Sequence, residues 1–79
     1  MQIYTANFLE EQLSKRLNKK VELRESFYSA EEDATYRKIY IDGQKTKTVF
    51  DLEDLTEYER RGILDKQLDK LAAKLNNGE

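Results

Sequence analysis

The first apolar pattern along this chain is a leucine stripe with the spacing of an α-helix. Its members, four residues apart, are Leu9, Leu13 and Leu17. Residues at this spacing share one helical face, so the stripe predicts a helix over about 6–18. Asn7 is the preferred N-cap, because Glu10 follows it by three residues as in a capping box, and Thr5 is the alternative.

A second leucine stripe, nearer the C-terminal end, predicts a longer helix over about 52–76. Its members are Leu64, Leu68, Leu71 and Leu75. Acidic residues fill the first part of this segment and lysines the last part, which suits the helix dipole. Gly62 lies inside the run and weakens a helix by about 1 kcal/mol relative to alanine. It marks either close packing or a division of the segment into two.

Between the two helices, apolar and polar residues alternate with the period of two that is typical of β-strands. Strands are expected over about 21–28, 35–41 and 44–50. Asp42-Gly43 joins the last two strands, because both central residues of a type I′ turn need positive φ, which glycine and aspartate tolerate. A two-residue turn of this kind pairs Ile41 with Gln44 and makes the segment a hairpin.

Continued without interruption, that register pairs Ile39 with Thr46 and Arg37 with Thr48. It also predicts which side chains face the core, because faces alternate along each strand. The strand residues expected in the core are Val21, Leu23, Phe27, Ile39, Ile41 and Phe50. Glu25 interrupts this apolar face, so it lies either near an edge or in a pair, for which Arg37 is the candidate partner. Such a pair can be catalytic, but a structural ion pair at the margin of the sheet is the preferred interpretation.

The order helix, strand, strand, strand, helix predicts a single small α+β domain. Three antiparallel strands with both helices packed on one face are the arrangement that buries every apolar stripe. A chain of 79 residues has room for one core only. We therefore assign the whole chain, residues 1–79, to one domain.

The composition removes much of the usual catalytic chemistry. There is no histidine and no cysteine, so the commonest general base, the commonest metal ligand and any thiol nucleophile are missing. The three glycines are isolated and form no phosphate-binding loop. We therefore expect no enzyme activity, no catalytic residue, no cofactor and no metal. No stretch approaches the roughly 20 apolar residues of a membrane span, and we expect a cytoplasmic protein.

The hairpin predicts a basic, tyrosine-bearing face turned away from the core. Its residues are Tyr36, Lys38, Tyr40, Lys45 and Lys47, with Tyr28 expected to join them. Lys38 is expected opposite Lys47. Exposed tyrosines beside lysines can stack on bases and contact phosphates, so nucleic-acid binding is one candidate function. The net charge of −2, from 14 basic and 16 acidic residues, argues against a protein dominated by phosphate contacts.

A second candidate surface is the acidic start of the last helical segment. Its residues are Asp51, Glu53, Asp54, Glu57 and Glu59. Asp51 can cap a helix that begins at Leu52, or Thr56 and Glu59 can form a capping box. With no catalytic chemistry, two charged surfaces and a tyrosine-bearing face, we expect a protein-binding module, either a monomer or a homodimer. Which of the two surfaces binds is open.

The order of elements over about 6–76 is similar to that of the double-stranded-RNA-binding domain. The resemblance includes the run from Tyr36 to Gly43, which looks like that family's strand ending in an Asn-Gly-type turn. In that family a lysine cluster at the start of the second helix binds RNA phosphates. The matching stretch here, 51–59, has five acids and no base, so no RNA-binding residue is carried over.

In general character the chain also resembles the small accessory proteins that phages and mobile elements make against host enzymes, including anti-CRISPR proteins. The likeness lies in its small size, its acidity and its lack of catalytic groups. What the resemblance implies is an inhibitor that acts by occupying a protein surface, such as the nucleic-acid-binding groove of a host enzyme.

Overall fold

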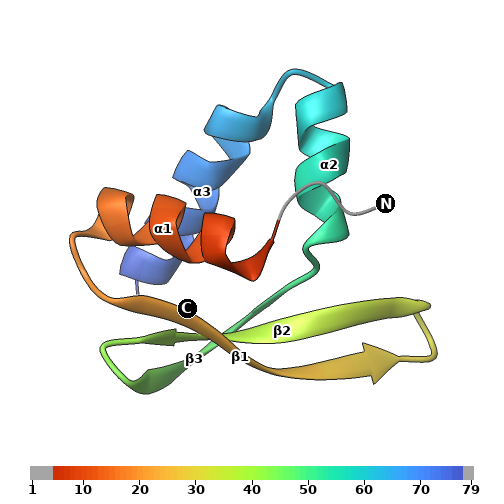
Figure 1. Ribbon diagram of the computed structural model, residues 1–79, viewed down its shortest axis with the longest axis horizontal. Helices are drawn as coiled ribbons and strands as arrows, with labels where there is room; N and C mark the ends of the chain where they lie inside the picture. The colour runs from red at the N-terminus through yellow and green to blue at the C-terminus, as the bar shows by residue number, and fades with distance from the viewer. Residues whose placement is uncertain (1–4, 78–79) are drawn as a thin grey trace.

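The structure, a computed structural model, describes residues 5–77. These residues form three helices and a three-stranded antiparallel sheet in the order α-β-β-β-α-α (Figure 1). The elements are α1 (Ala6–Leu17), β1 (Val21–Ser29), β2 (Ala34–Ile41), β3 (Gln44–Phe50), α2 (Glu53–Arg60) and α3 (Leu64–Asn76). All three helices lie on one face of the sheet and leave the other face uncovered, which confirms the predicted fold class.

The turn between β2 and β3 is the predicted two-residue turn. Asp42 and Gly43 have φ values of 51° and 83°, the positive values that a type I′ turn needs at both positions. Ile41 pairs with Gln44 across it, so the register expected next to the turn is confirmed. The N–H of Asp42 also donates to the carbonyl of Lys20 (2.8 Å), which ties the turn to the start of β1.

Further from the turn, β3 contains a bulge that the alternation pattern did not predict. Tyr40 pairs with Lys45, but Lys38 pairs with Val49, so three residues of β3 lie opposite Ile39 alone. An insertion of two residues leaves the later side chains on the face that period-two alternation gives them. The expected faces of β3 are therefore correct although the pairing is shifted.

The pairings predicted beyond this bulge are wrong. Arg37 faces Phe50 instead of Thr48. The hydroxyl of Thr46 supports the bulge, because it donates to the carbonyl of Ile39 (2.8 Å) and accepts from the N–H of Thr48 (3.2 Å). A threonine hydroxyl thus replaces part of the backbone ladder that the insertion interrupts.

A second bulge, in β1, reverses the faces of the last residues of that strand. Glu25 is the additional residue, because Arg24 and Ser26 pair with consecutive residues of β2, and it has a φ of 52°. A single extra residue moves every later side chain to the opposite face. Phe27, predicted for the core, therefore lies on the uncovered face, and Tyr28 lies on the helical side instead.

The start of α1 differs from the preferred prediction. Thr5 is the N-cap, and its hydroxyl accepts a hydrogen bond from the N–H of Phe8 (3.3 Å). Asn7 lies within the helix. Glu10, expected to close a capping box, instead accepts a hydrogen bond from the N–H of Leu23 (2.7 Å). This contact joins α1 to the edge strand β1 and satisfies an amide that lies beyond the reach of β2.

The helical segment predicted over 52–76 is divided into two helices, so one continuous helix is wrong. α2 ends at Arg60 and α3 begins at Leu64, with Gly62 between them at a φ of 70°. Of the two interpretations of Gly62, the division of the segment is the correct one. Glycine adopts this left-handed conformation at little cost and commonly ends helices. The N–H of Gly62 donates to the carbonyl of Glu59 (3.0 Å) in this turn.

The core lies between the sheet and the helices. Its buried apolar side chains are Leu9, Leu13, Val21, Ile39, Leu52, Leu55, Leu68, Ala72 and Leu75. Both leucine stripes contribute to it, as predicted, whereas Leu52 and Leu55 were not recognised as core residues. Outside the core, Arg16 links α1 to α3, with Nε 2.8 Å from Oδ1 of Asp69. Within residues 5–77, no helix is both long enough and apolar enough to cross a membrane.

Candidate functional site

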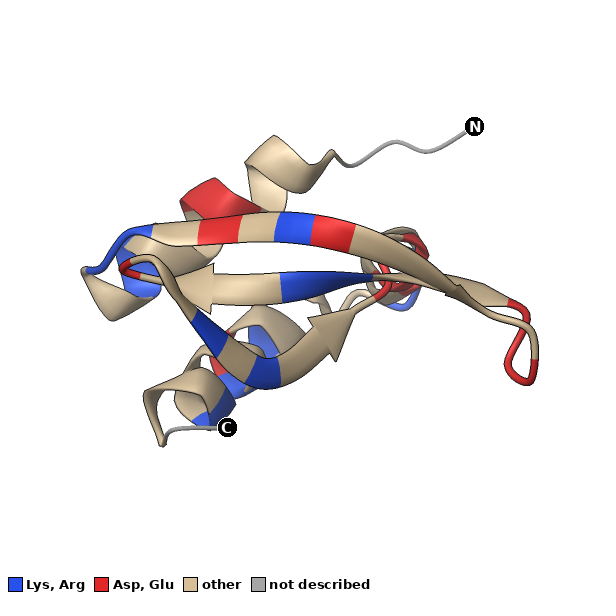
Figure 2. Cartoon of the chain, turned by 90° about the horizontal axis from the view of Figure 1, so that it is seen from below, with Lys and Arg blue, Asp and Glu red and all other residues tan. Residues whose placement is uncertain are grey.

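The uncovered face of the sheet, called here the open sheet face, carries the tyrosines and lysines that were predicted as a binding surface. β2 supplies Tyr36, Lys38 and Tyr40, and β3 supplies Lys45 and Lys47. Figure 2 views the molecule from this side and shows acidic and basic positions alternating along β1, with basic positions alone on β2 and β3. The fold therefore brings the five residues to one face, because alternate side chains of paired strands point the same way.

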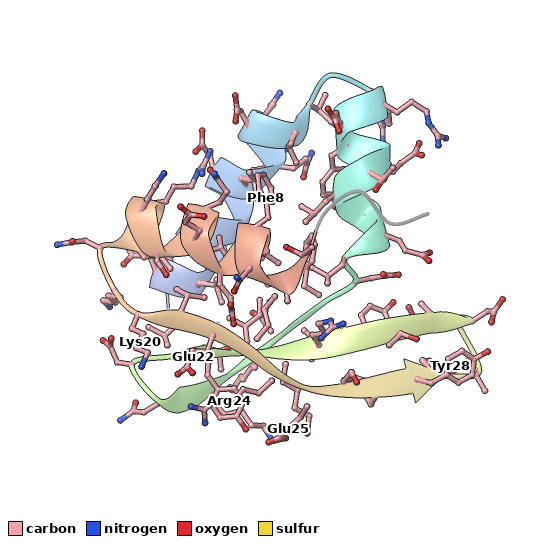
Figure 3. All side chains as sticks on the ribbon, in the orientation of Figure 1. Phe8, Lys20, Glu22, Arg24, Glu25 and Tyr28 are labelled. Carbon is pink, nitrogen blue, oxygen red and sulfur yellow. The ribbon has the colours of Figure 1, made fainter. Side chains whose placement is uncertain are left out.

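Glu25 lies at the centre of the polar contacts on this face. Its Oε2 is 3.3 Å from Nζ of Lys38, and its Oε1 accepts a 2.6 Å hydrogen bond from the hydroxyl of Tyr40. The predicted ion pair between Glu25 and Arg37 is therefore wrong. The bulge explains the difference, because Arg37 stays on the helical side whereas Glu25 points away from the helices (Figure 3).

These contacts change the acidity of both partners. The hydrogen bond from Tyr40, followed by the contact with Lys38, lowers the pKa of Glu25, because both favour the charged carboxylate. The same hydrogen bond raises the pKa of Tyr40, since the phenol must keep its proton to donate. Glu25 is therefore ionised at neutral pH and acts as the acceptor that orders the middle of the open sheet face.

Phe27 and Tyr36 form an aromatic pair on the same face, with their ring centroids 5.8 Å apart. The hydroxyl of Tyr36 donates to the carboxylate of Glu32. That hydrogen bond is the main cause that raises the pKa of Tyr36 to about 12. Tyr28, expected here, instead lies near the β1–β2 turn, where its hydroxyl donates to Asp33 (2.5 Å). Phe27 has thus taken the position predicted for Tyr28.

The open sheet face is mixed in charge, whereas the sequence predicted a basic surface. Arg24 lies 4.9 Å above the ring of Tyr40 and pairs with Glu22 at 3.0 Å. Lys38 is likewise paired with a carboxylate, and it faces Val49, so the predicted juxtaposition of Lys38 and Lys47 does not occur. Lys45 and Lys47 are the exposed cations of this face that have no ion-pair partner among residues 5–77.

The predicted acidic surface lies apart from the open sheet face, on the connection after β3 and on α2. Asp51 accepts a hydrogen bond from the N–H of Glu53 (3.0 Å) just before α2, but the N-cap is Leu52 and the helix begins at Glu53, so neither predicted capping scheme is correct. Partial burial, together with Asp51 and Glu53, raises the pKa of Asp54. Glu57 pairs with Arg60 at 3.2 Å, within the helix. Glu59, the last of the five, lies on the same helix.

Among the shallow grooves of the described residues, two lie where the sheet meets the segment from Asp51 onward. One, of about 270 Å3, is lined by Tyr28, Arg37 and Asp51 among others. The other, of about 290 Å3, lies where β3 meets α2 and α3 and is lined in part by Val49 and Leu71. Within the described residues, no cluster of three or more acidic side chains is placed to hold a metal ion.

Sequence reasoning missed three members of the open sheet face: Arg24 as a stacking partner, Glu25 as the central acceptor and Phe27 as an exposed ring. A single bulge accounts for the last two. The one available signal was Glu25 itself, a charged residue in the middle of an otherwise apolar strand face. A carboxylate at such a position is expensive to bury, so an insertion that turns it outward is a consistent alternative.

Comparison of the chain with models of known protein families, with curated proteins and with solved structures gave no match.

Proposed function

We propose that this domain is a non-catalytic protein-binding module whose open sheet face docks on a partner protein. The observation that carries the proposal is an aromatic surface on the side without helices. Phe27 is 40% exposed and packs against Tyr36, and Tyr40 lies further along the same strand. Aromatic anchors surrounded by charged residues are typical of the centres of protein interfaces.

The pairing of charges on this face favours a protein partner over nucleic acid. Arg24 is matched by Glu22, and Lys38 by Glu25. Glu32, which accepts a hydrogen bond from the hydroxyl of Tyr36, is a third acidic group among the basic residues of this face. Interleaved charges of both signs match a protein surface that is itself mixed, whereas carboxylates repel a phosphate backbone.

A nucleic-acid-binding domain is the alternative function. The observation in its favour is the stacking of Arg24 on Tyr40 near the exposed Lys45 and Lys47, because single strands bind to aromatic rings beside basic groups. Fluorescence anisotropy with labelled single-stranded DNA, duplex DNA and duplex RNA tests it. Binding that weakens steeply with salt supports this alternative, and flat traces at micromolar protein overturn it.

The proposal gives no residue a catalytic role. The chain has no histidine or cysteine, and the groups with shifted pKa on the open sheet face, Glu25, Tyr36 and Tyr40, are held in hydrogen bonds on an exposed surface. In its narrower form, the module is an inhibitor of the phage or mobile-element type that covers a host enzyme. We place it in the cytoplasm, in keeping with a chain that has no cysteine.

Affinity capture from the cells that produce the protein or that it targets tests the proposal. The baits are the unchanged domain, Lys45→Glu with Lys47→Glu on the open sheet face, and Glu53→Lys with Glu57→Lys on the acidic surface. The lysine pair is chosen because Lys38→Glu would place two carboxylates together beside Glu25. Circular dichroism checks that each variant keeps its helices.

A protein that is retained by the unchanged domain and by the acidic-surface variant, but lost with the lysine variant, supports the proposal. Isothermal titration calorimetry with that purified protein should then show at least a tenfold weaker Kd for the lysine variant, which is about 1.4 kcal/mol. If the captured protein is lost with the acidic-surface variant alone, the interface lies on α2 instead of the open sheet face. Equal capture by all three baits would overturn the use of either surface.

A further inference from the structure

The two edges of the sheet are not equivalent. At the β1 edge, the N–H of Val21 donates to the hydroxyl of Ser14 (3.1 Å) and the N–H of Leu23 donates to Glu10 (2.7 Å). α1 therefore occupies the outward amides of Val21 and Leu23, in the first part of that edge. At the β3 edge, no element other than β2 is hydrogen-bonded to the strand within residues 5–77. The first part of the β1 edge is thus covered by α1, whereas the β3 edge is open to pairing with an added strand.

Val49 presents its backbone at this open edge. Ile41 and Gln44 close the two-residue turn and form a hydrogen-bonded pair. Bonding directions alternate along an antiparallel strand, so the backbone groups of Lys38, three residues before Ile41, point toward β1. Val49 lies opposite Lys38, and its N–H and C=O therefore point away from β2. Its side chain is 38% exposed.

Val49 also lines the groove of about 290 Å3 between β3, α2 and α3. The groove residues that matter here are Thr48, Val49, Tyr58, Lys70, Leu71 and Lys74. Thr48 is 4% exposed, and its hydroxyl oxygen has no hydrogen-bond partner within the described residues. Buried hydroxyl groups are normally hydrogen-bonded, and Thr48 lines the groove, so its hydroxyl is a group that an occupant of the groove could satisfy.

The charges around the groove indicate which kind of partner it binds. Lys70 and Lys74 have no ion-pair partner among residues 5–77, and Lys45 and Lys47 lie along the same strand edge. Pairing of two copies through β3 would bring these strand lysines close together and is disfavoured by repulsion. An acidic segment instead gains from Lys70 and Lys74, which line the groove. Asp54 lines the end of the groove next to α2 and repels carboxylates there, so the carboxylates of the partner are expected at the end next to α3.

We infer that the β3 edge and its groove bind an extended, acidic segment of a partner protein, which pairs with the backbone of Val49. Its apolar side chains pack on Tyr58 and Leu71, and its carboxylates face Lys70 and Lys74. Main-chain bonds to an exposed edge combined with side-chain pockets are the general mode of strand addition. The inference rests on the proposed function in one respect, that the ligand is a protein, but it uses a different surface.

The test uses the full chain and three labelled peptides in fluorescence anisotropy. The probe is Glu-Val-Glu-Val-Glu-Val-Glu. One control replaces each glutamate with lysine, and the other replaces the central valine with proline, which cannot donate a backbone hydrogen bond. We expect the probe to bind, the lysine peptide not to bind, and the proline peptide to bind about tenfold more weakly. NMR amide shifts should map to β3 and α3.

Variants of the domain separate the groove from net charge. Lys70→Glu with Lys74→Glu should weaken probe binding about tenfold. Lys19→Glu with Lys20→Glu makes the same change in net charge at positions that do not line the groove, and should leave the affinity within about twofold. Thr48→Val should weaken binding about fivefold while raising the denaturant midpoint, because it removes an unpaired buried hydroxyl. A purely structural threonine would change the midpoint alone.

Absence of probe binding at millimolar protein would overturn the inference, as would equal binding of the lysine or proline peptide. Amide shifts confined to Tyr36, Tyr40 and their neighbours would overturn it too, and would place the acidic segment on the open sheet face. Light scattering on a sizing column checks that the probe binds a monomer. A dimer that dissociates as the probe binds would show that two copies of the chain pair through β3, against the argument from lysine repulsion. If the probe peptide does not bind, the affinity-capture result for the Lys45→Glu, Lys47→Glu variant still stands, because that variant tests the open sheet face.

Discussion

The hydroxyl of Tyr40 donates a 2.6 Å hydrogen bond to Oε1 of Glu25, fifteen positions earlier in the chain. Glu25 holds a positive φ of 52° at the bulge of β1, a conformation that costs about 1 kcal/mol or more for a residue with a side chain. The contacts with Tyr40 and Lys38 offset that cost and keep the carboxylate on the open sheet face. Backbone bulge and side-chain contacts therefore depend on each other.

Tyr40→Phe should raise the pKa of Glu25 toward its ordinary value, because the hydrogen bond from Tyr40 is the largest cause of the lowering. NMR titration of the Glu25 carboxyl measures this change. Tyr28→Phe removes a tyrosine hydroxyl elsewhere and should leave that pKa where it is. The folded-state pKa is lowered, so the contact stabilises the fold at neutral pH, and the stabilisation is lost as the pH falls through the lowered value.

Tyr36 should titrate near pH 12, above the ordinary tyrosine value of 10.0. Tyrosinate absorbance, taken as the difference between the unchanged chain and Tyr36→Phe, isolates this residue from the other tyrosines. Glu32→Gln should return the value toward 10.0, whereas Glu31→Gln should not. The folded-state pKa is raised, so this contact stabilises the fold fully below pH 10 and loses its contribution as the pH rises toward 12. An ordinary pKa for Tyr36 would contradict the Glu32 contact.

Gly62→Ala should lower the free energy of unfolding by roughly 1–2 kcal/mol, because alanine pays a steric cost at a φ of 70°. The space around Gly62 is open, so no clash contributes to the loss. Urea denaturation measures it, and Gly62→Asn should cost less because asparagine tolerates this conformation. A continuous helix over this region predicts the opposite sign, a gain of about 1 kcal/mol with alanine. Stabilisation by alanine would therefore refute the division into α2 and α3.

Leu55→Ala should destabilise the domain by about 2–5 kcal/mol, because Leu55 is fully buried between α2 and the rest of the core. A chain of this length has a total stability of about 4–12 kcal/mol, so the loss is a large share of it. Val49→Ala, at a partly exposed site, is the matched control and should cost under about 1 kcal/mol. Similar losses for the two variants would show that α2 does not belong to the core.

Local patterns were enough to predict the sheet, the hairpin turn and the two leucine stripes. Asp42 and Gly43 adopt their turn because of their own conformational preferences. The leucines are buried because their spacing leaves them on one helical face whatever they pack against. In β3 too, the side chains lie on the faces predicted for them, because a bulge of two extra residues restores the alternation.

What the sequence alone did not determine is where the strands depart from regular pairing, and this decided the candidate site. The extra residue at Glu25 puts Phe27, instead of Tyr28, on the open sheet face. It also places the Glu25 carboxylate in contact with Tyr40 and Lys38 instead of Arg37. A bulge depends on contacts between segments far apart in the chain, so the charged Glu25 in an apolar strand face was a hint that did not decide the pairing. The sequence by itself therefore determined the elements and the apolar surface of each, whereas the tertiary structure decided which side chains meet on the open sheet face and which strand edge stays free.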